Sequence, residues 1–458
     1  QKGELIISTG ELVTPEKYQT LISLKYDYEE DLNTSDSRMF IIAGMISLVS
    51  LMFLVQYLFI KFYRKRFYDQ IKYIVLILLS QLIFIVISDF VFITFPNWTY
   101  LIPFALLPIV ISAFLDAGIA IFVYLVTLML LGFYAPNSFE FFYTQAIVGL
   151  IAVFSVKKLS KRSDLFRATL LVFLTYFLVY ISMMLIQEGN LDSFSWRLLA
   201  YFGGSSILIL LAFPLIFIFE KLFGIITQLT LLELSNTNNP LLRDLSIKAP
   251  GTFQHSLQVA NLASEVLYEI GGDALLARTG ALYHDIGKMK NPMYFVENQV
   301  AGYNPHDELS YEESAKIIIG HVLGGIEMAR KEPIPEQIID FIRTHHGTRR
   351  VEYFYKLERK LNPGMEIDQS EFTYHGPAPF TKETAVVMMA DSVEAASRSI
   401  SEPDEQKISD LVENIFLSLM DNGQFLNADI TMKEINLAKK VLKKKLLNIH
   451  HVRIKYPE

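Results

Sequence analysis

Apolar positions divide this sequence into two regions of different character. Residues 39–222 are almost continuously apolar, whereas residues 223–458 mix apolar and polar positions as a soluble protein does. A helix that crosses a bilayer needs about 20 apolar residues. The first region supplies seven candidate segments, at residues 39–60, 73–95, 99–114, 117–133, 142–156, 167–186 and 198–219. The pattern therefore predicts a seven-transmembrane helical bundle over residues 39–222.

The division of one long apolar stretch decides the number of spans. As a single helix, residues 99–134 would be about 50 Å long, so we place a turn at Asp116 and Gly118. The basic loops 61–72 and 157–162 are both expected to be cytoplasmic, and only an even number of crossings can separate them. The split gives four crossings. Residues 1–38 are then an extracytoplasmic stub, interpreted as the end of a larger outer domain.

The second region has the pattern of an all-α domain. After residue 251, apolar residues recur every three to four positions, and alternation typical of strands is scarce. Breakers at residues 238–240 and 250–251 separate this domain from a linker helix expected over residues 223–250. We predict an all-α chain, in which the seven-transmembrane bundle is followed by an all-α cytoplasmic domain at residues 251–458.

Composition excludes several classes of function. The net charge of −7 argues against a general nucleic-acid binder, so no DNA partner is expected. The chain has no cysteine, which excludes disulfides, thiolate metal sites and a cysteine nucleophile. All nine histidines lie at or after His255. Any histidine chemistry therefore belongs to the soluble half.

Imidazoles and carboxylates in the soluble half form a candidate metal site. A single histidine on an apolar helix is usually a core residue, but seven ligand-type residues recur here, at His255, His284, Asp285, His321, His345, His346 and Asp391. Seven ligands exceed one tetrahedral site and suit two ions about 3.5–4 Å apart. Neutral imidazole and carboxylate are ligands for iron, manganese, zinc and similar divalent ions. An adjacent His-Asp pair at a helix end lets the carboxylate bridge both ions.

The local motifs resemble the HD superfamily of metal-dependent phosphohydrolases. They read GTFQHSLQVANLAS (251–264), ALYHDIGKMKNPMYFVENQ (281–299), IIIGHV (317–322), FIRTHHGT (341–348) and MMADSVEAASRS (388–399). Together with seven preceding spans, they are similar to the seven-transmembrane HD family. The resemblance implies a membrane-anchored phosphodiesterase that hydrolyses cyclic di-AMP to linear pApA, with a hydroxide between two Mn or Fe ions attacking phosphorus.

The same resemblance assigns roles to individual residues. One ion would be held by His255, His284, Asp285 and Asp391, and Asp285 would bridge to a second ion held also by His321, His345 and His346. The sister HD-GYP group has Gly-Tyr-Pro after its histidine pair, but residues 347–350 here read Gly-Thr-Arg-Arg, which favours the adenine dinucleotide. Asp285 and Lys288 would be catalytic. Lys288, Arg349, Arg398 and Tyr303 are candidate substrate contacts, each of which could instead be an ordinary surface charge or core aromatic.

Other roles stay open at the level of sequence. One alternative is an HD phosphohydrolase that acts on another nucleotide or on RNA, and another is a non-catalytic nucleotide-binding receptor. An intact set of seven ligands argues against a pure receptor. The resemblance also implies control by a stress nucleotide such as ppGpp and by an unknown extracytoplasmic ligand, and an oligomer is compatible with it.

Overall fold

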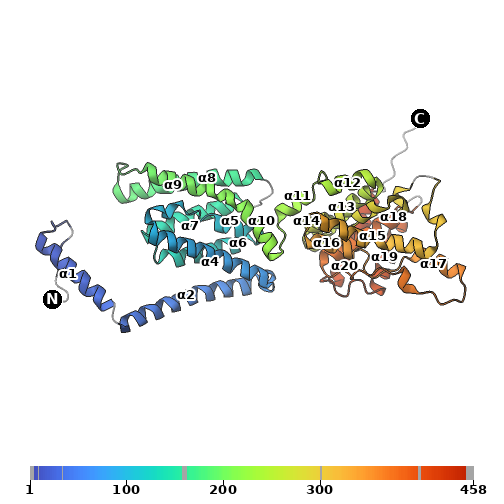
Figure 1. Cartoon of the computed structure of the whole chain (residues 1–458), viewed down its shortest axis with the longest axis horizontal. Helices are drawn as coiled ribbons and strands as arrows, with labels where there is room; N and C mark the ends of the chain where they lie inside the picture. The colour runs from blue at the N-terminus through green and yellow to red at the C-terminus, as the bar shows by residue number, and fades with distance from the viewer. Residues whose placement is uncertain are drawn as a thin grey trace, which may run out of the picture. The chain divides into compact units, whose positions relative to one another are not determined.

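The computed structural model describes residues 5–8, 10–32, 35–156, 162–299, 302–400 and 404–449. Within these ranges the regular elements are helices, and the one isolated bridge joins Arg350 and Thr373. The all-α expectation is confirmed. The chain folds as two compact units that divide between residues 218 and 219, and each is described by itself (Figure 1).

The first unit holds the apolar helices. They are α1 (Pro15–Leu32), α2 (Ser35–Tyr63), α3 (Lys65–Tyr68), α4 (Ile71–Thr94), η1 (Pro96–Leu101), α5 (Leu106–Phe114), α6 (Ala117–Gly132), α7 (Ser138–Ser155), α8 (Arg162–Glu188), α9 (Trp196–Leu208), η2 (Ile209–Leu211) and α10 (Ala212–Phe223), whose last turn enters the second unit. Among the described residues, six helical stretches are long and apolar enough to cross a membrane, and α6 is a shorter apolar helix. All seven predicted segments are therefore helical. The basic loop expected at 157–162 lies almost entirely outside the described residues.

Asp116 divides the long apolar stretch as the charge pattern predicted. Its carboxylate caps α6 by accepting a hydrogen bond from the Ile119 amide at 3.0 Å. It also accepts from Arg64 Nε at 2.6 Å. The loop after α2 and the turn before α6 therefore lie at the same end of this unit.

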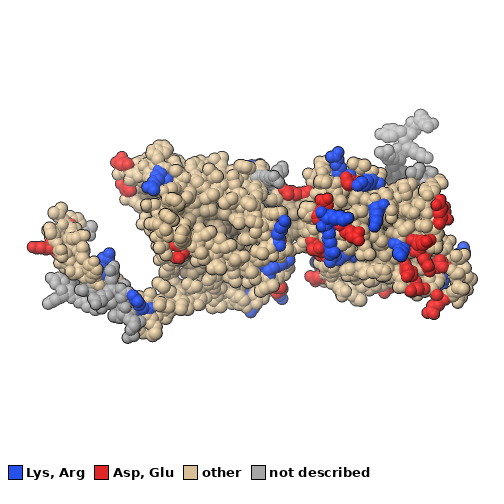
Figure 2. All heavy atoms as spheres, in the orientation of Figure 1, with Lys and Arg blue, Asp and Glu red and all other residues tan. Residues whose placement is uncertain are grey.

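Buried polar side chains join the helices of the first unit. Gln56 on α2 and Gln81 on α4 exchange amide hydrogen bonds of 2.9 and 3.1 Å, and Gln81 also donates to Thr127 on α6 at 3.0 Å. Such bonds hold helices together where apolar lipid offers no competing partner. Charged side chains are sparse over much of this unit and frequent over the second (Figure 2).

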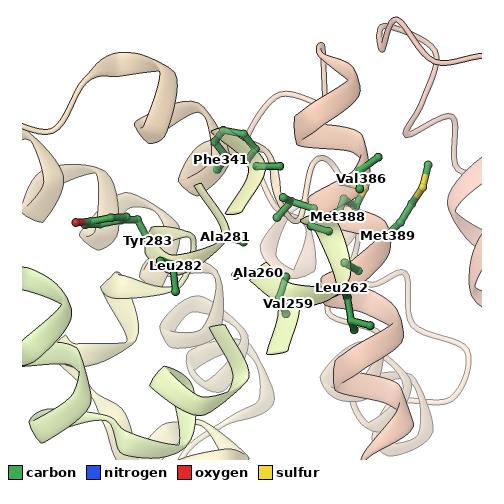
Figure 3. Packing of buried hydrophobic residues seen from close by; sticks show 14 of the residues in the cluster. Val259, Ala260, Leu262, Ala281, Leu282, Tyr283, Phe341, Val386, Met388 and Met389 are labelled. Atoms are coloured by element: carbon green, nitrogen blue, oxygen red, sulfur yellow. The ribbon is translucent and has the colours of Figure 1, made fainter. Parts of the chain in front are cut away.

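The second unit is a helical domain built around α13. Its elements are α11 (Gln228–Leu234), α12 (Pro240–Lys248), α13 (Pro250–Ile270), α14 (Ala274–Tyr283), η3 (Ile286–Lys290), η4 (Pro292–Tyr294), η5 (Val296–Asn298), η6 (Pro305–Glu308), α15 (Tyr311–Lys331), α16 (Glu336–Thr344), α17 (Glu352–Leu361), η7 (Gln369–Phe372), α18 (Lys382–Ser397), α19 (Glu405–Asp421) and α20 (Met432–Ile449). Figure 3 shows side chains of α13, α14, α16 and α18 meeting in its core.

The segment expected as one linker helix forms two helices that belong to this core. Pro240 starts α12, where its missing N–H costs nothing, and Asn239 caps it by accepting from Leu241 N at 3.2 Å. Four leucines of α11 and α12 are buried in the domain core, namely Leu231, Leu234, Leu242 and Leu245. Tyr283 Oη on α14 donates to the Leu234 carbonyl at 2.9 Å. The segment is thus part of the domain.

Candidate metal centre

Five helices bring the seven predicted ligands into one region of the second unit, two of them through the residues that follow their last turn. His284 and Asp285 follow α14, and His345 and His346 follow α16, while the other three lie within helices: His255 on α13, His321 on α15 and Asp391 on α18. Gly287 permits the close approach of η3 to α15, because a Cβ there would lie 1.8 Å from the His321 carbonyl oxygen. Residues separated by up to 136 positions therefore share one site.

Two groups of ligand atoms form at this site. Atoms of Asp285, His321, His345 and His346 all lie within 4.8 Å of one another, and so do atoms of His255, His284 and Asp391. Asp285 lies between the groups. Its Oδ1 is 3.3 Å from His321 Nε2 and 3.4 Å from His345 Nε2, and its Oδ2 is 3.2 Å from His284 Nε2. One carboxylate thus faces both groups.

The donor atoms are suited to divalent cations. Three histidines bond through Nδ1 to the carbonyl three residues earlier, at 2.6 Å for His284, 2.5 Å for His321 and 2.9 Å for His345. When Nδ1 carries the proton, Nε2 presents its lone pair to the centre. Within the described part of the chain, His284 Nε2 and Asp285 Oδ1 are buried without a hydrogen-bond partner. Such atoms are costly unless a ligand satisfies them, and a cation does so.

The electrostatics of the site keep its carboxylates ionised. Burial alone would raise the pKa of Asp285, but His284 and Lys288 hold it well below its usual range. Burial alone would lower the pKa of His284, but Asp285 and Asp391 raise it to about 10. Burial lowers the pKa of both His345 and His346. Neutral imidazole is the form that binds metal, and a divalent cation would also displace the proton from His284.

A cleft of about 540 Å³ opens over this centre. Among its lining residues are His255, His346 and Asp391 from the centre and three of the predicted substrate contacts, Lys288, Arg349 and Arg398. The fourth, Tyr303, is 53% exposed and is not among the described residues that line the cleft. It lies in the loop before η6.

The cations of the cleft already have partners. Lys288 Nζ lies 2.7 Å from Asp285 Oδ2 and 2.9 Å from Glu297 Oε1. Arg349 Nη1 donates to Ser392 Oγ at 2.8 Å, and Arg398 is paired with Glu394. The cleft wall is therefore a set of fixed positive charges beside the carboxylates of the centre, an arrangement that suits a phosphate ester.

Sequence reasoning missed three residues of this site. Glu297 accepts from Lys288, and Glu394 accepts from His255 Nδ1. The Tyr374 ring stacks on His346 with centroids 4.3 Å apart. Glu394 lies three residues after Asp391, so helical spacing could have placed it on the same face. Glu297 lies within the motif at residues 281–299, but spacing does not show that it contacts Lys288. Tyr374 comes from an irregular segment, and no pattern in the sequence marks it.

Two family models match this sequence. One described as "7TM receptor with intracellular HD hydrolase" matches residues 39–227, and the HD domain model matches residues 252–396. This chain belongs to the seven-transmembrane HD-domain family. The resemblance inferred from the motifs is confirmed.

Two named relatives of this HD-family chain are cyclic-di-AMP phosphodiesterases. The cyclic-di-AMP phosphodiesterase PgpH of Listeria monocytogenes is 33% identical over 471 residues, and that of Bacillus subtilis is 35% identical over 473 residues. Both alignments cover 100% of this chain but only 64% and 65% of the relatives, so the chain spans slightly less than two thirds of their length. A crystal structure of the L. monocytogenes PgpH HD domain with cyclic-di-AMP is 44% identical, with a TM-score of 0.46, covering 47% of this chain and 100% of that one.

Proposed function

We propose that this HD-family protein is a membrane-anchored, metal-dependent phosphodiesterase that hydrolyses cyclic di-AMP to linear pApA. The observation that carries the proposal is the shared carboxylate of Asp285, which faces two groups of ligand atoms beneath a cationic cleft. The similarity of the whole of this sequence to 64% and 65% of two cyclic-di-AMP phosphodiesterases supports the choice of substrate.

The proposed ligand sets follow the two groups of atoms. His255, His284, Asp285 and Asp391 would hold one ion, and His321, His345 and His346 would share Asp285 to hold another. Manganese and iron both accept imidazole and carboxylate ligands. When bound, a pair of such ions supplies an activated water and neutralises charge on a phosphoryl group.

The chain's own residues would bind and orient the substrate. Lys288 is fixed by Asp285 and Glu297, so its ammonium group presents a positive charge near the centre without needing to reorient. Arg349, held by Ser392, presents a second charge on the cleft wall. A cyclic dinucleotide carries two phosphates, and one charge beside the centre with another on the wall would orient one ester for attack.

The membrane helices suit an anchor in the bacterial cell membrane. We place residues 1–38 outside the cell and the HD domain in the cytoplasm, where a nucleotide messenger would be found. The contact between Arg64 and Asp116 supports an even number of crossings between these two turns, because an odd number would place them on opposite sides. The assignment of that side to the cytoplasm rests on the basic loops.

The test is an assay of the purified full chain in detergent with Mn²⁺. We expect cyclic di-AMP to be converted to pApA, with cyclic di-GMP and short RNA cleaved at least tenfold more slowly. Replacing both residues of the central pair, His284→Ala with Asp285→Ala, should abolish turnover. Faster cleavage of RNA or cyclic di-GMP would contradict the substrate assignment. Turnover by the double variant equal to that of the wild type would contradict the site.

A further inference from the structure

Glu394 lies directly behind one of the proposed metal ligands. It is on α18, three residues after Asp391, and its side chain is 8% exposed. Its Oε2 accepts a hydrogen bond from His255 Nδ1, while His255 Nε2 points to Asp391 Oδ1 at 2.9 Å. The two ring nitrogens of His255 are therefore held by two carboxylates of the same helix.

His255 differs in this respect from three other histidines of the centre. His284, His321 and His345 each bond through Nδ1 to a carbonyl of their own preceding turn. Those rings are oriented by the local backbone, whereas the orientation of His255 depends on a side chain 139 positions away. A carboxylate behind a ligating imidazole fixes the tautomer and increases the basicity of the ligand.

Arg398 fixes the carboxylate of Glu394 in turn. Its Nε donates to Oε1 at 2.9 Å and to Oε2 at 3.1 Å, and its Nη2 donates to Oε1 at 2.6 Å. This paired geometry sets the plane of the carboxylate. Asp391, Glu394 and Arg398 lie at positions i, i+3 and i+7, so they share one face of α18.

We propose that Glu394 is a positioning residue that orients His255 Nε2 toward the ligand atoms of His284 and Asp391. Arg398 holds the carboxylate of Glu394 in place. Arg398 would then act on metal binding through Glu394, in addition to any contact with a phosphate in the cleft. The inference rests on the proposed metal centre. It adds to that centre two residues that support a ligand but do not themselves touch the ion.

The test measures Mn²⁺ binding to the full chain by titration calorimetry after the resident metal is removed. Glu394→Ala should weaken one of two Mn²⁺ sites about 10- to 100-fold. Glu394→Gln should lose less, because its amide oxygen still accepts from His255. Arg398→Met should weaken the same site while leaving the other unchanged. Glu383→Ala is the matched control, since this carboxylate lies on the same helix and accepts from Asp273 N, away from the centre.

Each outcome separates the hypotheses. Wild-type affinity in Glu394→Ala, with folding verified by circular dichroism, would overturn the role of Glu394. If Glu394→Ala does not fold, Glu394→Met takes its place, because it keeps the volume of the side chain but accepts no hydrogen bond from His255. A raised KM in Arg398→Met with unchanged Mn²⁺ affinity would make Arg398 only a substrate contact and overturn its role in holding Glu394. Absence of Mn²⁺ binding in the wild type would instead contradict the proposed function.

Discussion

Lys288 lies between the carboxylates of Asp285 and Glu297. Its contribution to stability depends on whether another positive charge, such as a bound cation, also neutralises these carboxylates. Burial alone would lower the pKa of this amine, but Asp285 and Glu297 raise it above its usual value. The ammonium group is therefore charged at neutral pH. Its removal would leave two buried negative charges close together, and breaking a buried ion pair in this way costs about 3–5 kcal/mol.

We therefore predict that Lys288→Met destabilises the metal-free protein more than the Mn²⁺-loaded protein. A bound cation beside Asp285 would replace part of the lost positive charge. Calorimetric melting of the full chain, with chelator and with Mn²⁺, measures the difference. Lys290→Met removes an exposed lysine two residues away and should change neither melting temperature. An equal loss of stability with and without Mn²⁺ would argue against a cation next to Asp285.

At the residue scale, the sequence indicated seven candidate ligands, which the structure brings into two groups, and missed the side chains that contact them. The seven candidates could be proposed because imidazoles and carboxylates recur in a recognisable order. Glu394 was missed because its partner is His255, on a helix far away in the sequence, and a contact of that kind depends on how α13 crosses α18. Tyr303 was proposed as a contact because it is an aromatic residue in a loop of the right region, yet its side chain is largely exposed outside the cleft.

At the scale of elements, the crossing of α14 and α16 requires a glycine. A Cβ on Gly280 would lie 2.1 Å from Phe341 Cδ2, and Phe341 is fully buried at this crossing (Figure 3). Both helices end at proposed ligands. Their close contact therefore sets the separation between the His284–Asp285 pair and the His345–His346 pair.

Gly280→Ala should consequently destabilise the domain by about 1–3 kcal/mol, the usual result of overpacking a core. Gly320 on α15 is the matched control, because a Cβ there meets no atom within 4 Å. Gly320→Ala should raise stability by about 0.5–1 kcal/mol through helix propensity. Denaturant unfolding of the two variants checks both signs. Equal stability of the two variants would show that α14 and α16 can move apart to accommodate the added methyl group without loss of stability.

A second contact between elements gives a pH-dependent contribution to stability. Glu434 at the start of α20 accepts from Lys382 on α18 at 2.6 Å, and this hydrogen bond lowers the pKa of Glu434 to about 2. A lowered pKa in the folded state stabilises the protein above the ordinary value of about 4.5. That contribution is lost as the pH falls from there toward 2.

Lys382→Met should therefore cost about 0.5–1 kcal/mol at pH 7, a value limited by the solvent that reaches the pair. The difference from the wild type should shrink steadily below pH 4.5. Unfolding curves at pH 7, 5 and 3.5 provide the measurement. Lys248→Met, which breaks an exposed pair with Asp244 within one helix, should have a smaller effect. A constant difference at all three pH values would exclude Glu434 as the titrating partner.

Most helices could be predicted from periodicity, but their neighbours could not. The helix Tyr311–Lys331 is an example, because Ser310 and Glu313 form a capping box at its start and its apolar stripe is regular. The leucines of the 223–250 segment also showed helical spacing. Spacing alone does not say which core a helix joins, so the packing of α11 and α12 against α14 emerged only from the structure.

At the scale of the whole molecule, composition alone separated the two units. The apolar region and the histidine-bearing region differ so strongly that the boundary predicted near residue 222 lies close to the division at 218–219. The number of apolar segments was also predictable, because Asp116 interrupts the longest of them. Helix α6 is short, at 16 residues, and the predicted segment at residues 117–133 is short as well.

The burial of α11 and α12 has a practical consequence for anyone who expresses the HD domain alone. The HD family model begins at residue 252, but a shortened polypeptide starting there would expose the grooves that Leu231, Leu234, Leu242 and Leu245 fill. It should aggregate or melt early, whereas one starting at Thr227, the residue that caps α11, should stay monodisperse in size-exclusion chromatography. The folded boundary of the HD domain thus lies about 25 residues ahead of the start of the family match.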